Sequence, residues 1–158
     1  MSEQPFPEVE VKHALECALD ALCKADIHLL HVNSSERSMT HRLAVHLEPY
    51  FPDHAVDCEY NRDGSNVKRL KPSDRDAKSD DLDAVTVFPD IVVHKRGNNE
   101  GNLLVIEVKK GSSSASPDYD FQKLGAFKTE LHYAHAVHVT IGFAKDGKLV
   151  RHVVWLDG

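Results

Sequence analysis

Three charged residues, Asp90, Glu107 and Lys109, stand inside two apolar runs of the segment VFPDIVVHKRGNNEGNLLVIEVKK, residues 87–110. The Gly- and Asn-rich centre of this segment predicts a hairpin between two strands. If the two central asparagines form a two-residue turn, Asp90 lies opposite Glu107, with Cβ atoms roughly 4.5–5.5 Å apart. A longer loop that shifted the register by one would make them diagonal neighbours. Because side chains alternate along a strand, Lys109 shares a face with Glu107.

Two carboxylates at this distance repel, so the pair needs a compensating partner. Mg²⁺ is suitable, because it takes carboxylate oxygens at about 2.0–2.1 Å while it keeps waters and a phosphate oxygen. Lys109 would then orient a water or offset charge on a pentavalent phosphate. The alternative is an ordinary ion-pair cluster on a solvated face. However, the neighbouring residues are apolar on both faces of the two strands, which indicates a covered sheet and favours the site.

The elements that must position these residues belong to one domain of 158 residues. Apolar spacings of three and four predict helices over 8–31, about 36–48 and 120–133, the second capped by Ser34 or Ser35. Apolar and β-branched runs predict strands over 55–60, 85–95, 102–109, 136–143 and 148–156. Residues 61–83 are polar and predict a long loop. The order ααβββαββ indicates an α/β or α+β layered fold with antiparallel pairing at its centre.

The pair PD at residues 89–90 and the triplet EVK at 107–109 resemble the PD-(D/E)xK signature of the restriction-endonuclease-like phosphodiesterase superfamily. The resemblance spans about residues 34–144. It implies a core of order α-β-β-β-α-β, with a central mixed sheet flanked by helices. The 8–31 helix and a C-terminal hairpin strand would be additions to that core.

The resemblance also implies a metal-dependent nuclease that cuts within nucleic acid, DNA rather than RNA. The cofactor would be Mg²⁺, with Mn²⁺ able to substitute. The implied metal ligands are Glu36, Asp90, Glu107 and the Val108 carbonyl. The implied catalytic residues are Asp90, Glu107, Lys109 and Lys123, the last as a phosphate contact. Glu36 could instead be only a first-turn acid that favours the helix dipole.

A second hypothesis comes from another class of protein. A catalytically silent relative would keep the fold as a module that binds nucleic acid or protein, although the complete Asp, Glu and Lys set argues against it. Superfamily members that cut duplexes often act as dimers, so a homodimer through the 8–31 helix is an option. Packing against the core would explain the apolar face of that helix equally well.

The net charge of −6, with histidine neutral, argues against a broad basic face that coats nucleic acid. A polyanion would have to meet a local basic patch. The candidates for this patch are Lys68, Arg69, Lys71, Lys110 and Lys128.

No apolar run approaches the roughly 20 residues that span a bilayer, and the N-terminal segment lacks secretory features, so we expect a cytoplasmic protein without a membrane partner. Three cysteines without a CxxC pair predict buried thiols rather than disulfides or a zinc site. The histidines at 132, 135 and 138 lack the further ligands that a tetrahedral zinc site needs.

Overall fold

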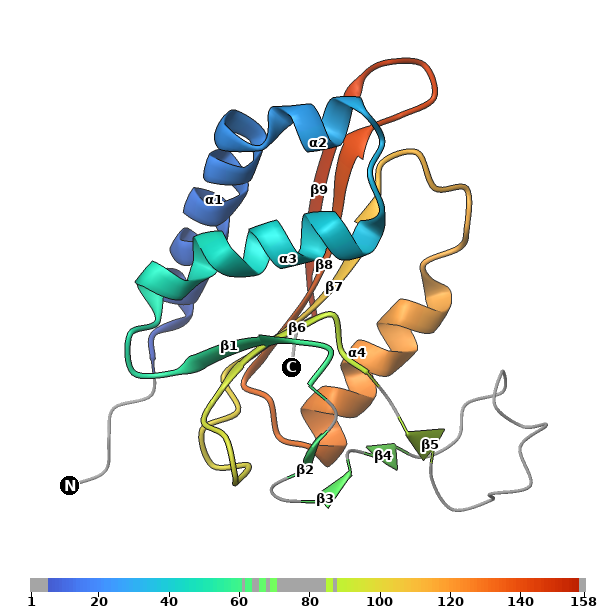
Figure 1. Cartoon of the computed structure of the whole chain (residues 1–158). Helices are drawn as coiled ribbons and strands as arrows, with labels where there is room; N and C mark the ends of the chain where they lie inside the picture. The colour runs from blue at the N-terminus through green and yellow to red at the C-terminus, as the bar shows by residue number, and fades with distance from the viewer. Residues whose placement is uncertain are drawn as a thin grey trace.

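A computed structural model describes residues 6–60, 62–63, 66–67, 69–70, 85–86 and 88–156 (Figure 1). The helices are α1 (Glu8–Ala25), α2 (Ile27–His31), α3 (Glu36–Leu47), the 3-10 turn η1 (Glu48–Tyr50) and α4 (Asp118–Glu130). The strands of the main sheet are β1 (Ala55–Cys58), β6 (Ile91–His94), β7 (Leu104–Lys110), β8 (His135–Phe143) and β9 (Leu149–Trp155). The short strands are β2 (Arg62–Asp63), β3 (Asn66–Val67), β4 (Arg69–Leu70) and β5 (Val85–Thr86).

The main sheet is mixed and has five strands in the order β1-β6-β7-β8-β9. Its middle strand, β7, pairs antiparallel with β6 and parallel with β8. The layered α/β class and the mixed sheet are therefore as predicted, whereas antiparallel pairing describes only one side of the centre. The parallel pair forms because α4 carries the chain back across the sheet, as a parallel connection requires.

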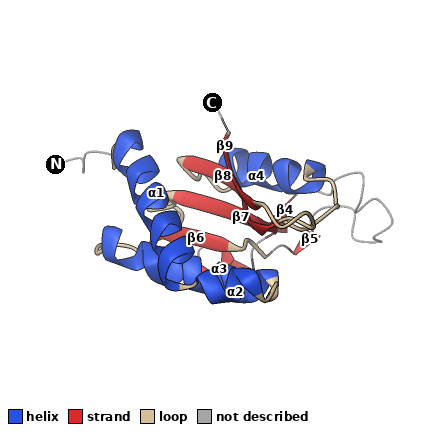
Figure 2. Ribbon diagram, turned by 90° about the horizontal axis from the view of Figure 1, so that it is seen from above, coloured by secondary structure: helices blue, strands red, loops and turns tan. Residues whose placement is uncertain are grey.

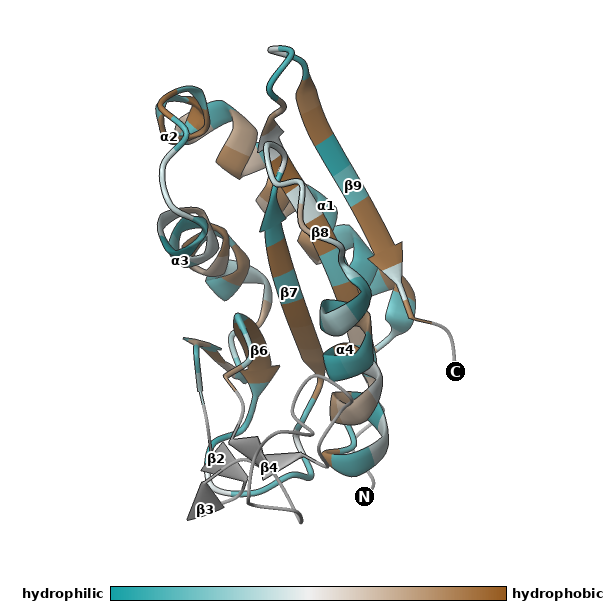
Figure 3. Ribbon diagram, turned by 90° about the vertical axis from the view of Figure 1, so that its right-hand side faces the viewer, coloured by the Kyte–Doolittle hydropathy of each residue, from teal (hydrophilic) through white to brown (hydrophobic). Residues whose placement is uncertain are grey.

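Helices cover both faces of the sheet, as Figure 2 shows from above. Helices α1 and α3 pack on one face, against Val93, Ile106 and Val108, while α4 packs on the other, against Val92 and Val105. All five of these strand residues are at most 4% exposed. Figure 3 shows β7 as hydrophobic over much of its length and hydrophilic toward its end. Charged side chains therefore enter the covered sheet near the end of β7.

The register predicted for the β6–β7 hairpin is confirmed, but the predicted two-residue turn is wrong. Val92 pairs with Val105, and the other pairs of the ladder keep the same offset. The connection instead covers residues 95–103. Asn102 helps to fix this longer loop, because its buried side chain donates a hydrogen bond to the Leu131 carbonyl at 2.7 Å.

Other boundaries also differ from the sequence prediction, and the strand predicted over 85–95 is divided into β5 and β6, which belong to different sheets. The 8–31 helix is interrupted at Asp26, which leaves α1 and α2 as separate helices. The Asp26 carboxylate contacts α3, where it accepts a hydrogen bond from Arg42 at 3.2 Å and lies 2.6 Å from the His46 ring. These tertiary contacts accompany the break.

The predicted loop over 61–83 contains the short strands β2, β3 and β4: β2 pairs with β3, and β4 pairs with β5, which follows the loop. The other residues in this range lie outside the described part of the chain. Within the described residues, no helix has the length and apolar character needed to cross a bilayer.

Candidate functional site

The candidate site lies where β6 stops pairing with β7. The ladder ends at the Ile91–Ile106 pair. Two positions further along, Pro89 would face Val108, but proline has no N–H to contribute to a ladder. The Val108 amide instead donates to Asp90 Oδ2 at 2.7 Å. The Asp90 side chain thus replaces the neighbouring strand as the partner of β7.

Glu107 is the buried acid of the site, with a side chain only 3% exposed. Burial raises its pKa well above the usual range, and the adjacent Asp90 carboxyl adds to the shift by its charge and by a hydrogen bond. Lys123 opposes this shift, with Nζ 3.1 Å from Glu107 Oε1. That ion pair lacks hydrogen-bond geometry, so Oε1 is a buried oxygen that accepts no hydrogen bond. The two acids therefore face each other, as the register predicted.

Lys123 joins α4 to both strands of the site. In addition to its ion pair with Glu107, its ammonium donates to the Phe88 carbonyl at 3.2 Å. Burial alone would lower the pKa of Lys123, but the carboxylate of Glu107 outweighs burial and raises it. The ammonium is thus stabilised in its charged form beside the two acids.

Lys109 points to the same side of the sheet, where it meets two residues that the sequence analysis did not assign to the site. Asp120 Oδ2 lies 3.4 Å from Lys109 Nζ and 3.2 Å from the ring of His138. Burial raises the pKa of Asp120, but His138 and Lys109 outweigh it and lower the pKa overall. His138, in turn, is 3% exposed and stacks against Phe121. Asp120 therefore contacts the buried ring of His138 and the partly buried ammonium of Lys109, and it anchors Lys109.

Two sequence signals could have identified this pair. Asp120 precedes Lys123 by three residues on a helix, which puts both on one face. In the parallel ladder, His138 stands directly beside Glu107. The second signal needs the β7–β8 register, which no short-range pattern supplies.

Glu36 approaches the site from the first turn of α3, across the end of β7. Partial burial of the Glu36 carboxyl raises its pKa, whereas the charge of Lys109 and a hydrogen bond from the backbone of Lys110 lower it. The residue as a whole is exposed. Glu36 and Asp90 also line one pocket of about 460 Å³. Among the described residues, however, no three His, Cys, Asp or Glu side chains lie close enough to hold a metal ion. The predicted ligand set is therefore gathered in one region but not assembled around one point.

Val108, the predicted carbonyl ligand, is 4% exposed and directs its amide toward Asp90. Because the N–H and C=O of one strand residue point to the same side, its carbonyl also faces the gap left by β6.

The predicted basic patch is only partly in place. Lys110 lies at the end of β7 near the site, where its ammonium donates to the Asn33 carbonyl at 3.4 Å. Lys128 is directed away from the site and donates to the Leu156 carbonyl beyond β9, at 3.2 Å. Arg69 is defined only as a backbone position in β4, and Lys68 and Lys71 lie outside the described residues.

The prediction of buried thiols is wrong for Cys58, which is exposed, whereas Cys17 and Cys23 are partly buried. Cys58 lines the same pocket as Asp90. The partial enclosure of its thiol and the surrounding acids, Asp57 and Asp90 among them, raise its pKa to about 11. The thiol is therefore almost fully protonated at neutral pH.

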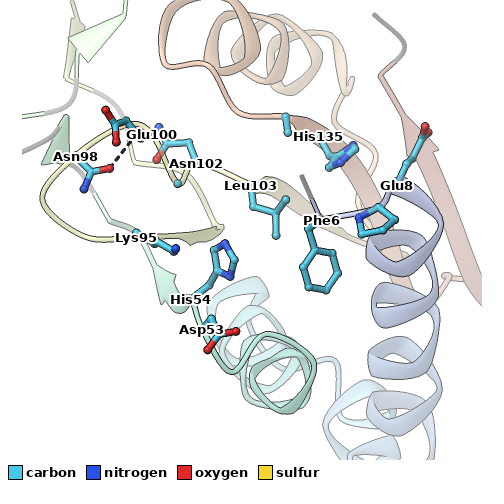
Figure 4. A pocket seen from close by; sticks show the side chains of 13 residues that line it. Phe6, Glu8, Asp53, His54, Lys95, Asn98, Glu100, Asn102, Leu103 and His135 are labelled. Carbon is cyan, nitrogen blue, oxygen red and sulfur yellow. Dashed lines mark hydrogen bonds between the residues drawn. The ribbon is translucent and has the colours of Figure 1, made fainter. Parts of the chain in front are cut away.

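A larger pocket, of about 820 Å³, lies at the other end of the sheet, near the start of β7 (Figure 4). Phe6, His54 and Leu103 line its floor, and Lys95 and His135 lie at its sides. None of the predicted site residues lines this pocket. The acids and lysines that could perform hydrolysis are thus gathered at the opposite end of β7.

Comparisons of the chain with protein-family models, with curated proteins and with solved structures found no match.

Proposed function

We propose that this chain is a metal-dependent phosphodiesterase that hydrolyses nucleic acid, acting on DNA in preference to RNA and within the strand. The observation that carries the proposal is the convergence of two facing carboxyls with two lysines: Asp90 and Glu107 meet at the end of the β6–β7 ladder, and Lys109 and Lys123 lie beside them. Structural ion-pair networks seldom bury two acids against each other, because the like charges repel.

The order of elements around the site also supports the proposal. From α3 the chain passes through β1, β6 and β7, then α4, then β8. With the short strands β2–β5 between β1 and β6 set aside, this succession agrees with the α-β-β-β-α-β order that the PD-(D/E)xK resemblance implies, with Asp90 entering β6 and Glu107 on β7. The preference for DNA, and a homodimer if one forms, rest on that resemblance alone.

The donor set suits Mg²⁺ or Mn²⁺. Both acids offer the hard oxygen ligands that such ions prefer, and the Val108 carbonyl faces the same gap. Glu107 Oε1 is buried and is met by the Lys123 ammonium at 3.1 Å without a well-formed hydrogen bond, so it keeps lone pairs that a cation can use. When bound, the ion would supply Lewis acidity for attack of water on phosphorus.

The side chains themselves bind and orient the substrate. Asp120 holds the Lys109 ammonium beside Glu107, where it can donate to a non-bridging phosphoryl oxygen as negative charge develops there. Lys123 can exchange its ion pair with Glu107 for a second phosphoryl oxygen. Water adds to phosphorus and gives up a proton to solvent, while the bond between phosphorus and the leaving oxygen breaks and that oxygen takes up a proton from solvent.

The test measures cleavage of supercoiled plasmid and of a labelled single strand with Mg²⁺ or Mn²⁺. The wild-type chain should cut at least one substrate, and Asp90→Asn and Lys109→Met should each reduce the rate about 100-fold or more. Lys145→Met is the matched control, because Lys145 is exposed in the β8–β9 turn and is not among the residues of the site. Its rate should equal that of the wild type.

Binding of the metal is measured separately by calorimetry. If Mn²⁺ binds through Asp90 but no nucleic acid is cut, the catalytically silent interaction module becomes the better description. If Lys109→Met cuts as fast as the wild type, the assignment of the site is wrong.

A further inference from the structure

An exposed aromatic side chain stands directly beside the proposed site. Phe88, two residues before Asp90, is 50% exposed, although a phenyl ring is ordinarily covered in the folded state. Among the described residues, the other exposed aromatic side chain is Tyr50, which belongs to η1 at the far end of α3. The exposure of Phe88 thus coincides with the site.

The backbone that carries Phe88 is held in place from both sides. Its carbonyl accepts a hydrogen bond from Lys123 Nζ at 3.2 Å, and the same nitrogen lies 3.1 Å from Glu107 Oε1. The next residue, Pro89, is buried and has a fixed φ angle. Asp90 is then anchored on the Val108 amide. The ring therefore projects from a fixed point, two residues before Asp90.

The net charge of the chain indicates how an exposed ring would contribute to binding. A protein of net charge −6 gains little affinity for nucleic acid from phosphate contacts alone. Stacking of a base on an aromatic side chain adds affinity that does not depend on the release of counterions, and it tolerates every base because each has a π-face. In a duplex both faces of a base are covered by its neighbours, whereas an unpaired base offers a free face.

On these grounds, and resting on the proposed function, we propose that Phe88 is a stacking platform for the unpaired base next to the phosphate that is cut. The substrate class is then single-stranded nucleic acid, or a single-stranded segment beside a duplex. Lys123, which fixes the Phe88 backbone, couples this platform to the two acids.

The experiment combines changes in the protein with changes in the substrate. The single strand is compared with the same strand carrying one abasic position beside the cut site, and with a duplex. Phe88→Ala should raise KM for the normal strand about tenfold with kcat little changed, and Phe88→Trp should restore the wild-type KM. On the abasic strand the wild type should already show the raised KM, and Phe88→Ala should raise it no further. Tyr50→Ala, which removes the other exposed aromatic, should leave KM unchanged.

An equal loss on normal and abasic strands, or a loss on duplex alone, would overturn the inference. A thermal melt of each variant excludes a folding defect as the cause. Binding of a phosphorothioate strand, followed by fluorescence anisotropy, separates this inference from the proposed function. If binding depends on Phe88 but no substrate is cleaved, the proposed hydrolysis is refuted and the stacking role of Phe88 is retained. If the chain cleaves the strand equally well without Phe88, the stacking role is refuted and hydrolysis is retained.

Discussion

Substitution of Glu107 by glutamine tests whether the buried acid exists to hold a metal ion. The side chain is 3% exposed, and its Oε1 accepts no hydrogen bond. A buried acceptor left in this state costs about 1–3 kcal/mol, and more when it is charged. An ion bound between Glu107 and Asp90 would remove this cost. At a metal concentration 100 times Kd, the gain in the free energy of unfolding is about 2.7 kcal/mol.

For a chain of this length, 1 kcal/mol corresponds to a shift in Tm of about 2–4 °C. Saturating Mn²⁺ should therefore raise the Tm of the wild-type chain by about 5–10 °C. Glu107→Gln should abolish most of this rise, because the amide carries no negative charge. Glu100→Gln, an exposed acid in the β6–β7 connection, is the matched control and should keep the full shift.

Without metal, the same variant has a pH signature of known sign. The raised pKa of Glu107 means that the folded protein favours the protonated acid. The stabilisation is fully present below the unfolded pKa of about 4.3 and is lost as pH rises through the higher folded pKa. The wild type should thus lose stability relative to Glu107→Gln as pH rises above about 4.5. Glu107→Gln also loses the ion pair with Lys123, which lowers the stability of the variant. The raised pKa of Glu107 is the net result of burial and of this ion pair, so the expected pH dependence keeps its sign.

The assay is differential scanning fluorimetry at several pH values, with and without Mn²⁺. A Glu107→Gln chain that keeps the full metal-dependent rise in Tm would refute the reasoning, since the ion would then be bound elsewhere. A wild type that gains stability relative to the variant as pH rises would show that the ion pair with Lys123, rather than the burial of charge, governs the site.

Three further predictions follow from contacts near the site and in the fold. Asp120→Asn should lower kcat about 10- to 100-fold with little change in KM, because Lys109 loses its anchor; steady-state kinetics measures this, and a change in KM alone would contradict it. Asp57→Asn should cost about 1–2 kcal/mol at pH 7 through loss of the contacts with Arg96. Burial raises the pKa of Asp57, but the contacts with Arg96 and His94 outweigh burial and lower it. The difference in free energy of unfolding between the variant and the wild type, measured by urea denaturation, should therefore persist above about pH 4. It should vanish as pH falls through the lowered pKa. Ser35→Ala removes the N-terminal cap of α3 and should lower the free energy of unfolding by about 0.5–2 kcal/mol in the same denaturation experiment, and an unchanged value would show that solvent caps the helix equally well.

The strands themselves were predictable from their apolar, β-branched runs. In β6 and β7 both faces are buried, so the burial pattern alone does not select a register. The predicted register came from a turn centred on Asn98 and Asn99, and the longer connection that the structure has keeps the same pairing. That register was enough to bring Asp90 to Glu107. The length of the turn was not predictable in the same way, because it depends on Asn102 and its contact with the distant Leu131 carbonyl.

The residues that the sequence analysis missed are those whose role depends on the crossover through α4. Asp120 and His138 are separated by 18 residues and meet only when β8 lies parallel to β7. The break at Asp26 was not predictable from local sequence either, because the partners of its carboxylate belong to α3. Local propensity describes segments well, but it carries no information about which segment will lie beside which.

The Cys58 thiol lies where a cation bound at Asp90 would change its rate of alkylation. This thiol lines the pocket that Asp90 also lines, and nearby acids, Asp90 among them, help to raise its pKa to about 11. Thiolate is the form that alkylating reagents attack, so modification at neutral pH should be slow. A divalent cation at Asp90 would offset the charge that suppresses ionisation and so accelerate labelling. The rate at which Cys58 itself is alkylated, distinguished from Cys17 and Cys23, would thus report occupancy of the site.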